Sequence, residues 1–151
     1  MEERAKVALI SCDPAFRQEL GRWLRQEDAF EVLWEARDGG EAARLGRGAW
    51  PDVILVDVPG SPLGLRPLNG PDGAFLPGGR VVLLLGSEME HLVLEALRWG
   101  AQGYLIKEKC QAADVISAVQ AVRQGEAVLS PRVLGLMMDD LARRGCSGSQ
   151  P

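Results

Sequence analysis

The chain has 151 residues, of which 46% are hydrophobic and 25% are charged, and this length favours one domain with a tail over two domains. Its net charge of −4 argues against a nucleic-acid-binding surface on this segment, because contacts with phosphates require clustered Lys and Arg. No apolar stretch approaches the roughly 20 residues that span a bilayer, and the N-terminus lacks the organisation of a signal peptide. We therefore expect a cytoplasmic protein without a membrane segment, and its three cysteines, which lack metal-binding spacing, should be free thiols.

Short apolar runs alternate with amphipathic segments along most of the chain. Strands are predicted at residues 6–11, 30–36, 52–57, 80–85 and 103–106, with a short helix weakened by glycines at 38–48. Asp13 and Pro14 form the N-cap and first residue of an earlier helix. Ser87 and Glu90 form a capping box for a later one, and the last regular helix ends at Gly125.

Five strands alternating with helices predict a parallel sheet that is covered on both faces, because right-handed crossovers place helices over buried strands. The expected fold class is α/β, with a doubly wound five-stranded parallel sheet. One crossover differs from the others: residues 59–79 are rich in proline and glycine at the place where the third crossover helix belongs. We expect little helix there.

A further helix is predicted over 129–144, with Ser130 as its N-cap and Pro131 as its first residue. We therefore divide the chain into a domain at 1–127 and a linker or dimerisation helix with a disordered tail at 128–151. This helix carries more apolar residues than one sheet face can cover, namely Leu134, Leu136, Met137, Met138 and Leu141. Such a surplus favours a homodimer.

Two charged residues stand at the carboxyl ends of predicted strands. Asp57 ends the buried run 52–57, and Lys107 directly follows 103–106 in a chain with only three lysines. Ligands of parallel α/β sheets gather at this edge. Each residue taken alone is more simply a turn cap or a solvated charge, but the pair indicates a functional site.

Three stretches of the chain resemble one known family. "PDVILVD", "LVLEALRWGAQGYLIKE" and "AVRQGEAVLSPRVLGLMMDDL" are similar to segments of two-component response-regulator receiver domains of the NarL-like subfamily, and the resemblance covers residues 5–144. It implies a flavodoxin-like receiver fold in a signalling protein that is not an enzyme and that forms part of a transcriptional regulator. It also implies that a sensor histidine kinase donates a phosphoryl group, and that DNA is bound only through a domain outside this chain.

The resemblance assigns roles to individual residues. Asp57 matches the phosphoacceptor, Lys107 the lysine that counters its charge, and Tyr104 the aromatic switch residue. The Thr or Ser that accompanies this switch in the family is replaced by Leu85, which cannot hydrogen-bond a phosphoryl oxygen. The sequence therefore lacks the hydroxyl that would couple phosphorylation to the switch.

The acid pair that holds Mg²⁺ in the family is also replaced. Its positions are Ser11 and Cys12, and Asp13 is the only acid nearby. A hydroxyl and a thiol are poor ligands for Mg²⁺, which prefers oxygen ligands that include carboxylates. We expect Asp13 to act as a helix cap, Cys12 to be a small half-buried residue, and Mg²⁺ binding to be weak or absent.

The turn after Asp57 is two residues shorter than in the family, which displaces a carbonyl that helps to hold the metal. Together these departures predict an atypical receiver that regulates through protein contacts, largely without Mg²⁺-dependent phosphorylation. A working phosphoreceiver, with Asp13 and Asp57 holding the metal, is the alternative. A flavodoxin-like cofactor enzyme is a more distant one, because "SCDPAF" offers no glycine-rich phosphate loop.

Overall fold

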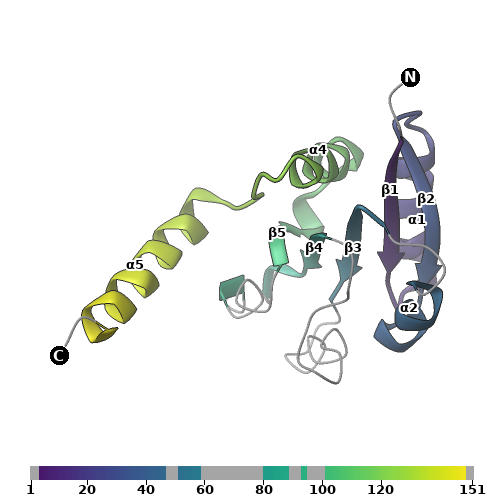
Figure 1. The fold of residues 1–151 in the computed structure, drawn as a ribbon. Helices are drawn as coiled ribbons and strands as arrows, with labels where there is room; N and C mark the ends of the chain where they lie inside the picture. The colour runs from purple at the N-terminus through teal and green to yellow at the C-terminus, as the bar shows by residue number, and fades with distance from the viewer. Residues whose placement is uncertain (1–3, 47–50, 59–79, 89–92, 95–100, 149–151) are drawn as a thin grey trace.

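The computed structural model of the chain describes residues 4–46, 51–58, 80–88, 93–94 and 101–148. Within this part, five strands form one parallel sheet in the order β2-β1-β3-β4-β5 (Figure 1). The strands are β1 (Ala5–Ile10), β2 (Phe30–Ala36), β3 (Val53–Asp57), β4 (Arg80–Leu85) and β5 (Ala101–Ile106). The predicted α/β fold with a doubly wound five-stranded parallel sheet is confirmed.

Capping residues mark the ends of the helices. The helices described are α1 (Pro14–Arg25), α2 (Gly39–Gly46), α4 (Ala112–Arg123) and α5 (Pro131–Gly148), with a short 3₁₀ turn η3 (Lys107–Lys109). The Asp13 carboxylate accepts hydrogen bonds from the amides of Ala15 and Phe16, as predicted for the N-cap of α1. After α4, Gly125 adopts a φ of 92°, which suits glycine just beyond a helix.

Apolar side chains cover both faces of the sheet. On one face, α1 and α4 pack on alternate strand residues; this layer includes Leu20, Leu24, Val115, Val119, Val7, Leu9, Val53, Leu55, Val82 and Leu84. The opposite layer includes Ala42 of α2, Val133 of α5, Ile10, Ile54, Val56, Leu83, Leu85 and Tyr104. The central strands are therefore buried on both sides, as expected of a parallel sheet.

The strand register brings functional positions together at the carboxyl edge. Ile10 of β1 pairs with Val56 of β3, so that the next residues, Ser11 and Asp57, become neighbours. Lys107 begins η3 immediately after β5, at the same edge of the sheet. The sheet order thus joins residues that lie far apart in the sequence.

Beyond α4 the chain returns to the sheet before it enters α5. Val128 forms an isolated parallel bridge with Gly103 of β5. Helix α5 continues to Gly148 instead of ending at residue 144, so the prediction placed its end too early. The predicted irregular crossover at 59–79 and the capping acid Glu90 lie outside the described residues. Within the described ranges, no helix has both the length and the apolar character needed to cross a membrane.

Candidate functional site

Asp57 lies at the end of β3 and is only 5% exposed. The ammonium of Lys107 donates a hydrogen bond to Asp57 Oδ1 at 2.6 Å. The hydroxyl of Ser11 donates one to Asp57 Oδ2 at 2.8 Å. Each oxygen of this buried carboxylate therefore has a donor from the protein, and its negative charge is matched by one positive charge.

Lys107 reaches Asp57 across the end of an intervening strand. It starts from β5, whereas Asp57 ends β3, and β4 lies between the two strands. The ammonium also lies 5.5 Å from the centre of the Phe16 ring, within the range of a cation–π contact. The lysine stem thus spans the sheet edge while its charged end is held between a carboxylate and an aromatic ring.

Ser11 is fully buried and is fixed from several directions. Its hydroxyl accepts a hydrogen bond from the amide of Asp13 at 3.2 Å, and it lies 3.3 Å from the carbonyl oxygen of the same residue. The guanidinium of Arg17 donates to the Ser11 carbonyl at 2.7 Å. Because a hydroxyl has one proton, its shorter contact, to Asp57, is the stronger of its two possible donations.

Cys12 and Asp13, the two residues that follow Ser11, have different surroundings from it. Cys12 is exposed, so the expectation that it would be half-buried is wrong. The Asp13 side chain is used in capping α1. Among the residues described, no group of three or more His, Cys, Asp or Glu side chains is arranged to hold a metal ion. Asp57, Ser11 and Cys12 do not supply the carboxylate pair that suits Mg²⁺.

The two positions matched to the family switch are both buried. Leu85 has no exposed surface and offers only hydrocarbon at the end of β4. Tyr104 is 5% exposed, and its hydroxyl lies 2.9 Å from the Ser130 hydroxyl at the start of α5. The aromatic residue is therefore hydrogen-bonded to the helix that follows the domain.

A contact that the sequence did not reveal lies beside Lys107. The amide of Ser87 donates to the Glu108 carboxylate at 2.9 Å and links the loop after β4 to the one after β5. Hydrogen bonds from the Ser87 side chain and then from its backbone lower the pKa of Glu108. Glu108 directly follows the matched lysine, but nothing in its sequence position indicates Ser87 as its partner.

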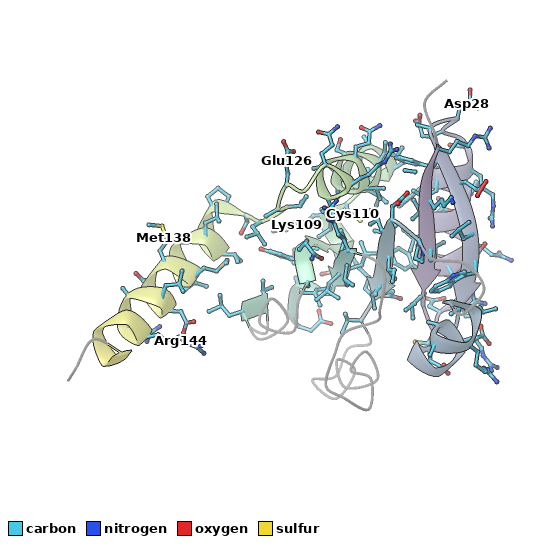
Figure 2. All side chains as sticks on the ribbon, viewed as in Figure 1. Asp28, Lys109, Cys110, Glu126, Met138 and Arg144 are labelled. Atoms are coloured by element: carbon cyan, nitrogen blue, oxygen red, sulfur yellow. The ribbon has the colours of Figure 1, made fainter. Side chains whose placement is uncertain are left out.

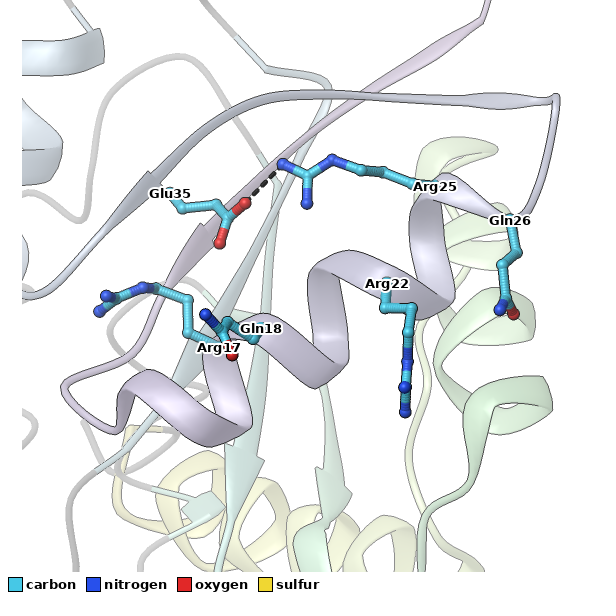
Figure 3. A pocket seen from close by; sticks show the side chains of 6 residues that line it. All are labelled: Arg17, Gln18, Arg22, Arg25, Gln26 and Glu35. Atoms are coloured by element: carbon cyan, nitrogen blue, oxygen red, sulfur yellow. Dashed lines mark hydrogen bonds and ion pairs between the residues drawn. The ribbon is translucent and has the colours of Figure 1, made fainter.

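A hollow lies away from Asp57, over α1 and the neighbouring strand β2 (Figure 3). Its lining residues are Arg17, Gln18, Arg22, Arg25, Gln26 and Glu35. Arg25 forms an ion pair with Glu35 across it, and Arg22 pairs with Glu19. Arg17 also donates to the Ser11 carbonyl, so Arg17, Arg22 and Arg25 each have a partner within the protein.

Known proteins resemble the chain in both sequence and fold, although no family model matches it. It is 31% identical over 147 residues to the transcriptional regulatory protein DegU of Brevibacillus brevis, covering 94% of this chain and 60% of DegU. It is 33% identical over 131 residues to the nitrate/nitrite response regulator protein NarL of Escherichia coli, covering 85% of this chain and 59% of NarL. The chain thus spans less than two thirds of either relative.

Solved receiver domains share the arrangement of strands and helices. The signal receiver domain of a NarL-type regulator from Mycobacterium tuberculosis superposes with a TM-score of 0.70 at 29% identity, covering 83% of this chain and 100% of that domain. A LuxR-family two-component response regulator from Aurantimonas superposes with a TM-score of 0.71 at 26% identity, covering 93% and 99%. The fold is that of a receiver domain.

In sequence the chain is similar to NarL-type response regulators, the family that its motifs resemble, and in fold it is similar to their receiver domains.

Proposed function

We propose that this receiver domain is a regulatory and protein-interaction module of a transcriptional regulator, and that it works largely without Mg²⁺-dependent phosphorylation of Asp57. The observation that carries the proposal is the pairing of both carboxylate oxygens, with Lys107 at 2.6 Å and Ser11 at 2.8 Å. An acceptor carboxylate that is already hydrogen-bonded and charge-balanced within the protein gains less from binding a metal ion.

The charge at the site supports weak Mg²⁺ binding. Asp57 and Lys107 together have no net charge, and Ser11 adds none, so a divalent cation would meet little attraction. Asp13 could add a carboxylate only by giving up its hydrogen bonds to the first turn of α1, which are typically worth about 1 kcal/mol as a helix cap. Among the residues that the structure describes, this edge of the sheet therefore offers no pair of carboxylates for Mg²⁺.

A phosphoryl group on Asp57 would also lack one of its usual hydrogen-bond donors. Leu85 provides no hydroxyl at the end of β4, and Lys107 would be the remaining cation beside the added charge. Phosphoryl transfer depends mainly on positioning and charge stabilisation, so the loss of both the metal and the hydroxyl should slow it by orders of magnitude.

The alternative is a working phosphoreceiver that takes a phosphoryl group on Asp57 from a histidine kinase. The retained pair of Asp57 and Lys107 favours it, because these two residues are the acceptor and its counter-charge in the resemblance. This alternative requires Mg²⁺ to bind despite the exchange of the acid pair for Ser11 and Cys12. Metal binding therefore separates the two functions.

The proposed partners are proteins. A second copy of the chain and a sensor histidine kinase are the partners that the family resemblance implies, and contact with DNA is assigned to a domain outside this chain. These assignments concern a whole regulator, whereas the chain spans only 60% of the length of DegU and 59% of that of NarL.

Calorimetric titration with Mg²⁺ tests the proposal. The native chain should show no saturable binding at millimolar Mg²⁺, whereas the double variant Ser11→Asp with Cys12→Asp should bind, because it restores two carboxylates beside Asp57. Adding Asp57→Asn to that double variant should abolish the binding, and circular dichroism should show that all three proteins are folded. Sub-millimolar Mg²⁺ binding by the native chain would favour the working phosphoreceiver instead.

A further inference from the structure

Helix α5 is attached to the domain through the segment that leads into it. The Val128 amide donates a hydrogen bond to the Gln102 carbonyl at 3.2 Å, and the Tyr104 amide donates one to the Val128 carbonyl at 3.0 Å. Two residues later, the Ser130 hydroxyl lies 2.9 Å from the hydroxyl of Tyr104. Tyr104 therefore holds the incoming chain at two points, one through its main chain and one through its side chain.

Ser130 connects the second of these points to the helix itself. Its hydroxyl accepts a hydrogen bond from the Val133 amide at 3.2 Å, and its carbonyl accepts one from the Leu134 amide at 3.0 Å. The Ser130 side chain is thus both the N-cap of α5 and the partner of Tyr104. A displacement of the Tyr104 hydroxyl would therefore disturb a group that fixes the first turn of the helix.

The core of the domain holds Tyr104 in place. This residue is 5% exposed and belongs to the same apolar layer as Leu85 and Val133. Its main chain is part of β5, which pairs with β4. Because a closely packed interior leaves an aromatic ring few alternative positions, the Tyr104 hydroxyl meets Ser130 at a fixed point.

Farther along its length, α5 extends away from the sheet (Figure 1). Val133 is buried and Met137 packs partly against the core, but apolar burial is non-directional. From Met138 to Arg144 the residues are exposed, apart from the half-buried Asp140, and Figure 2 shows Met138 and Arg144 projecting from different sides of the helix. A helix of 18 residues is about 27 Å long, so a small tilt at its first turn displaces its far end much more.

We infer that Tyr104 and Ser130 are positioning residues for α5, because the hydrogen bond between their hydroxyls fixes the direction in which the helix leaves the domain. With the main-chain bonds at Val128 alone, the helix could pivot about residues 128–130. The inference goes beyond the proposed function, since it holds whether or not Asp57 accepts a phosphoryl group. A partner that redirects α5 would also disturb Tyr104 in the core, and by thermodynamic linkage the reverse is equally true.

Distances between two spin labels on the full chain test the inference. In a chain whose three native cysteines are replaced by alanine, labels at Gln120→Cys on α4 and Ala142→Cys on α5 report the direction of the helix, because both positions are exposed. An excess of unlabelled protein removes distances between molecules. The labelled chain should give one main distance, and Tyr104→Phe and Ser130→Ala should each replace it by a broad distribution.

Further variants separate this role from ordinary helix capping. Ser130→Thr retains a hydroxyl and should keep the single distance. Ser117→Ala removes an exposed hydroxyl from α4 and should also keep it, as the control. Tyr104→Phe leaves Ser130 able to cap α5, so a broad distribution in that variant does not come from a lost cap. Adding Tyr104→Phe to Ser130→Ala should change little, because both substitutions remove the same hydrogen bond.

The result for Tyr104→Phe decides the inference, once circular dichroism has shown that each variant is folded. A single unchanged distance in this variant would overturn it, even if Ser130→Ala gave a broad distribution, because the latter would then reflect only the lost cap. A broad distribution in the labelled chain without either substitution would overturn it as well. The residues of the Asp57 site are unaltered in every variant, so a failure here is distinguishable from a failure of the proposed function.

Discussion

Lys107→Met isolates the charge pair at the centre of the site. Methionine keeps an apolar stem of similar length but removes the ammonium that donates to Asp57 at 2.6 Å. Removing one partner of a buried ion pair typically costs about 3–5 kcal/mol. The Lys107 side chain is 30% exposed while that of Asp57 is 3% exposed, so solvent screening reduces the expected cost to about 2 kcal/mol.

Urea unfolding followed by circular dichroism measures this cost. With a slope of about 1–3 kcal/mol per molar urea, a loss of about 2 kcal/mol lowers the midpoint by roughly 1 M. Lys109→Met is the matched control, because Lys109 belongs to the same short turn η3 and is exposed. Its midpoint should stay close to that of the native chain.

A double-mutant cycle shows whether the cost comes from Asp57. In an Asp57→Asn background, which has no carboxylate charge at this position, Lys107→Met should cost much less than in the native chain. If Lys107→Met destabilises both backgrounds equally, or no more than Lys109→Met does, the argument that Lys107 stabilises a buried Asp57 charge is wrong.

Three further predictions concern contacts away from the charge pair. Gly103→Ala should destabilise the chain by about 1–3 kcal/mol in urea unfolding, because its Cβ would lie 2.8 Å from the Val128 carbonyl oxygen; an unchanged midpoint would contradict the close approach. Ser87→Ala should raise the pKa of Glu108 toward its ordinary value in a carboxyl NMR titration. Because that pKa is lowered in the folded chain, the stability it contributes is present above the unfolded pKa and lost as the pH falls through the folded pKa; the variant should lose less stability over this acidic range. Burial raises the pKa of the Cys110 thiol, so iodoacetamide should label it only slowly at neutral pH, and rapid labelling would contradict its half-buried position.

Features of the fold that depend on local sequence could be predicted. The strand at 30–36 has the predicted limits, and Asp13 caps α1, because apolar periodicity and capping act over a few neighbouring residues. The helix predicted over 129–144 was expected to give way to a disordered tail, but α5 continues through Gly145 to Gly148. One glycine weakens a helix without necessarily ending it.

The site was predicted only in part because its contacts join distant segments. Asp57 and Lys107 could be matched from strand ends and a family resemblance, but Ser11 was considered only as a poor metal ligand. Ser11 can donate a hydrogen bond to Asp57 only because β1 and β3 pair in a register that makes the two residues neighbours. That register cannot be read from the sequence alone. The partnership of Glu108 with Ser87 similarly depends on two loops meeting at the sheet edge.

Phosphorylation of Asp57 tests the central claim most directly. The native chain and Asp57→Ala are incubated with acetyl phosphate and Mg²⁺, and the intact masses are measured. We expect no appreciable phosphoryl adduct on either protein, because Ser11 and Cys12 supply no metal-binding acids and Leu85 supplies no hydroxyl at the end of β4. A stoichiometric adduct on the native chain that is absent from Asp57→Ala would contradict the account and identify a working phosphoreceiver.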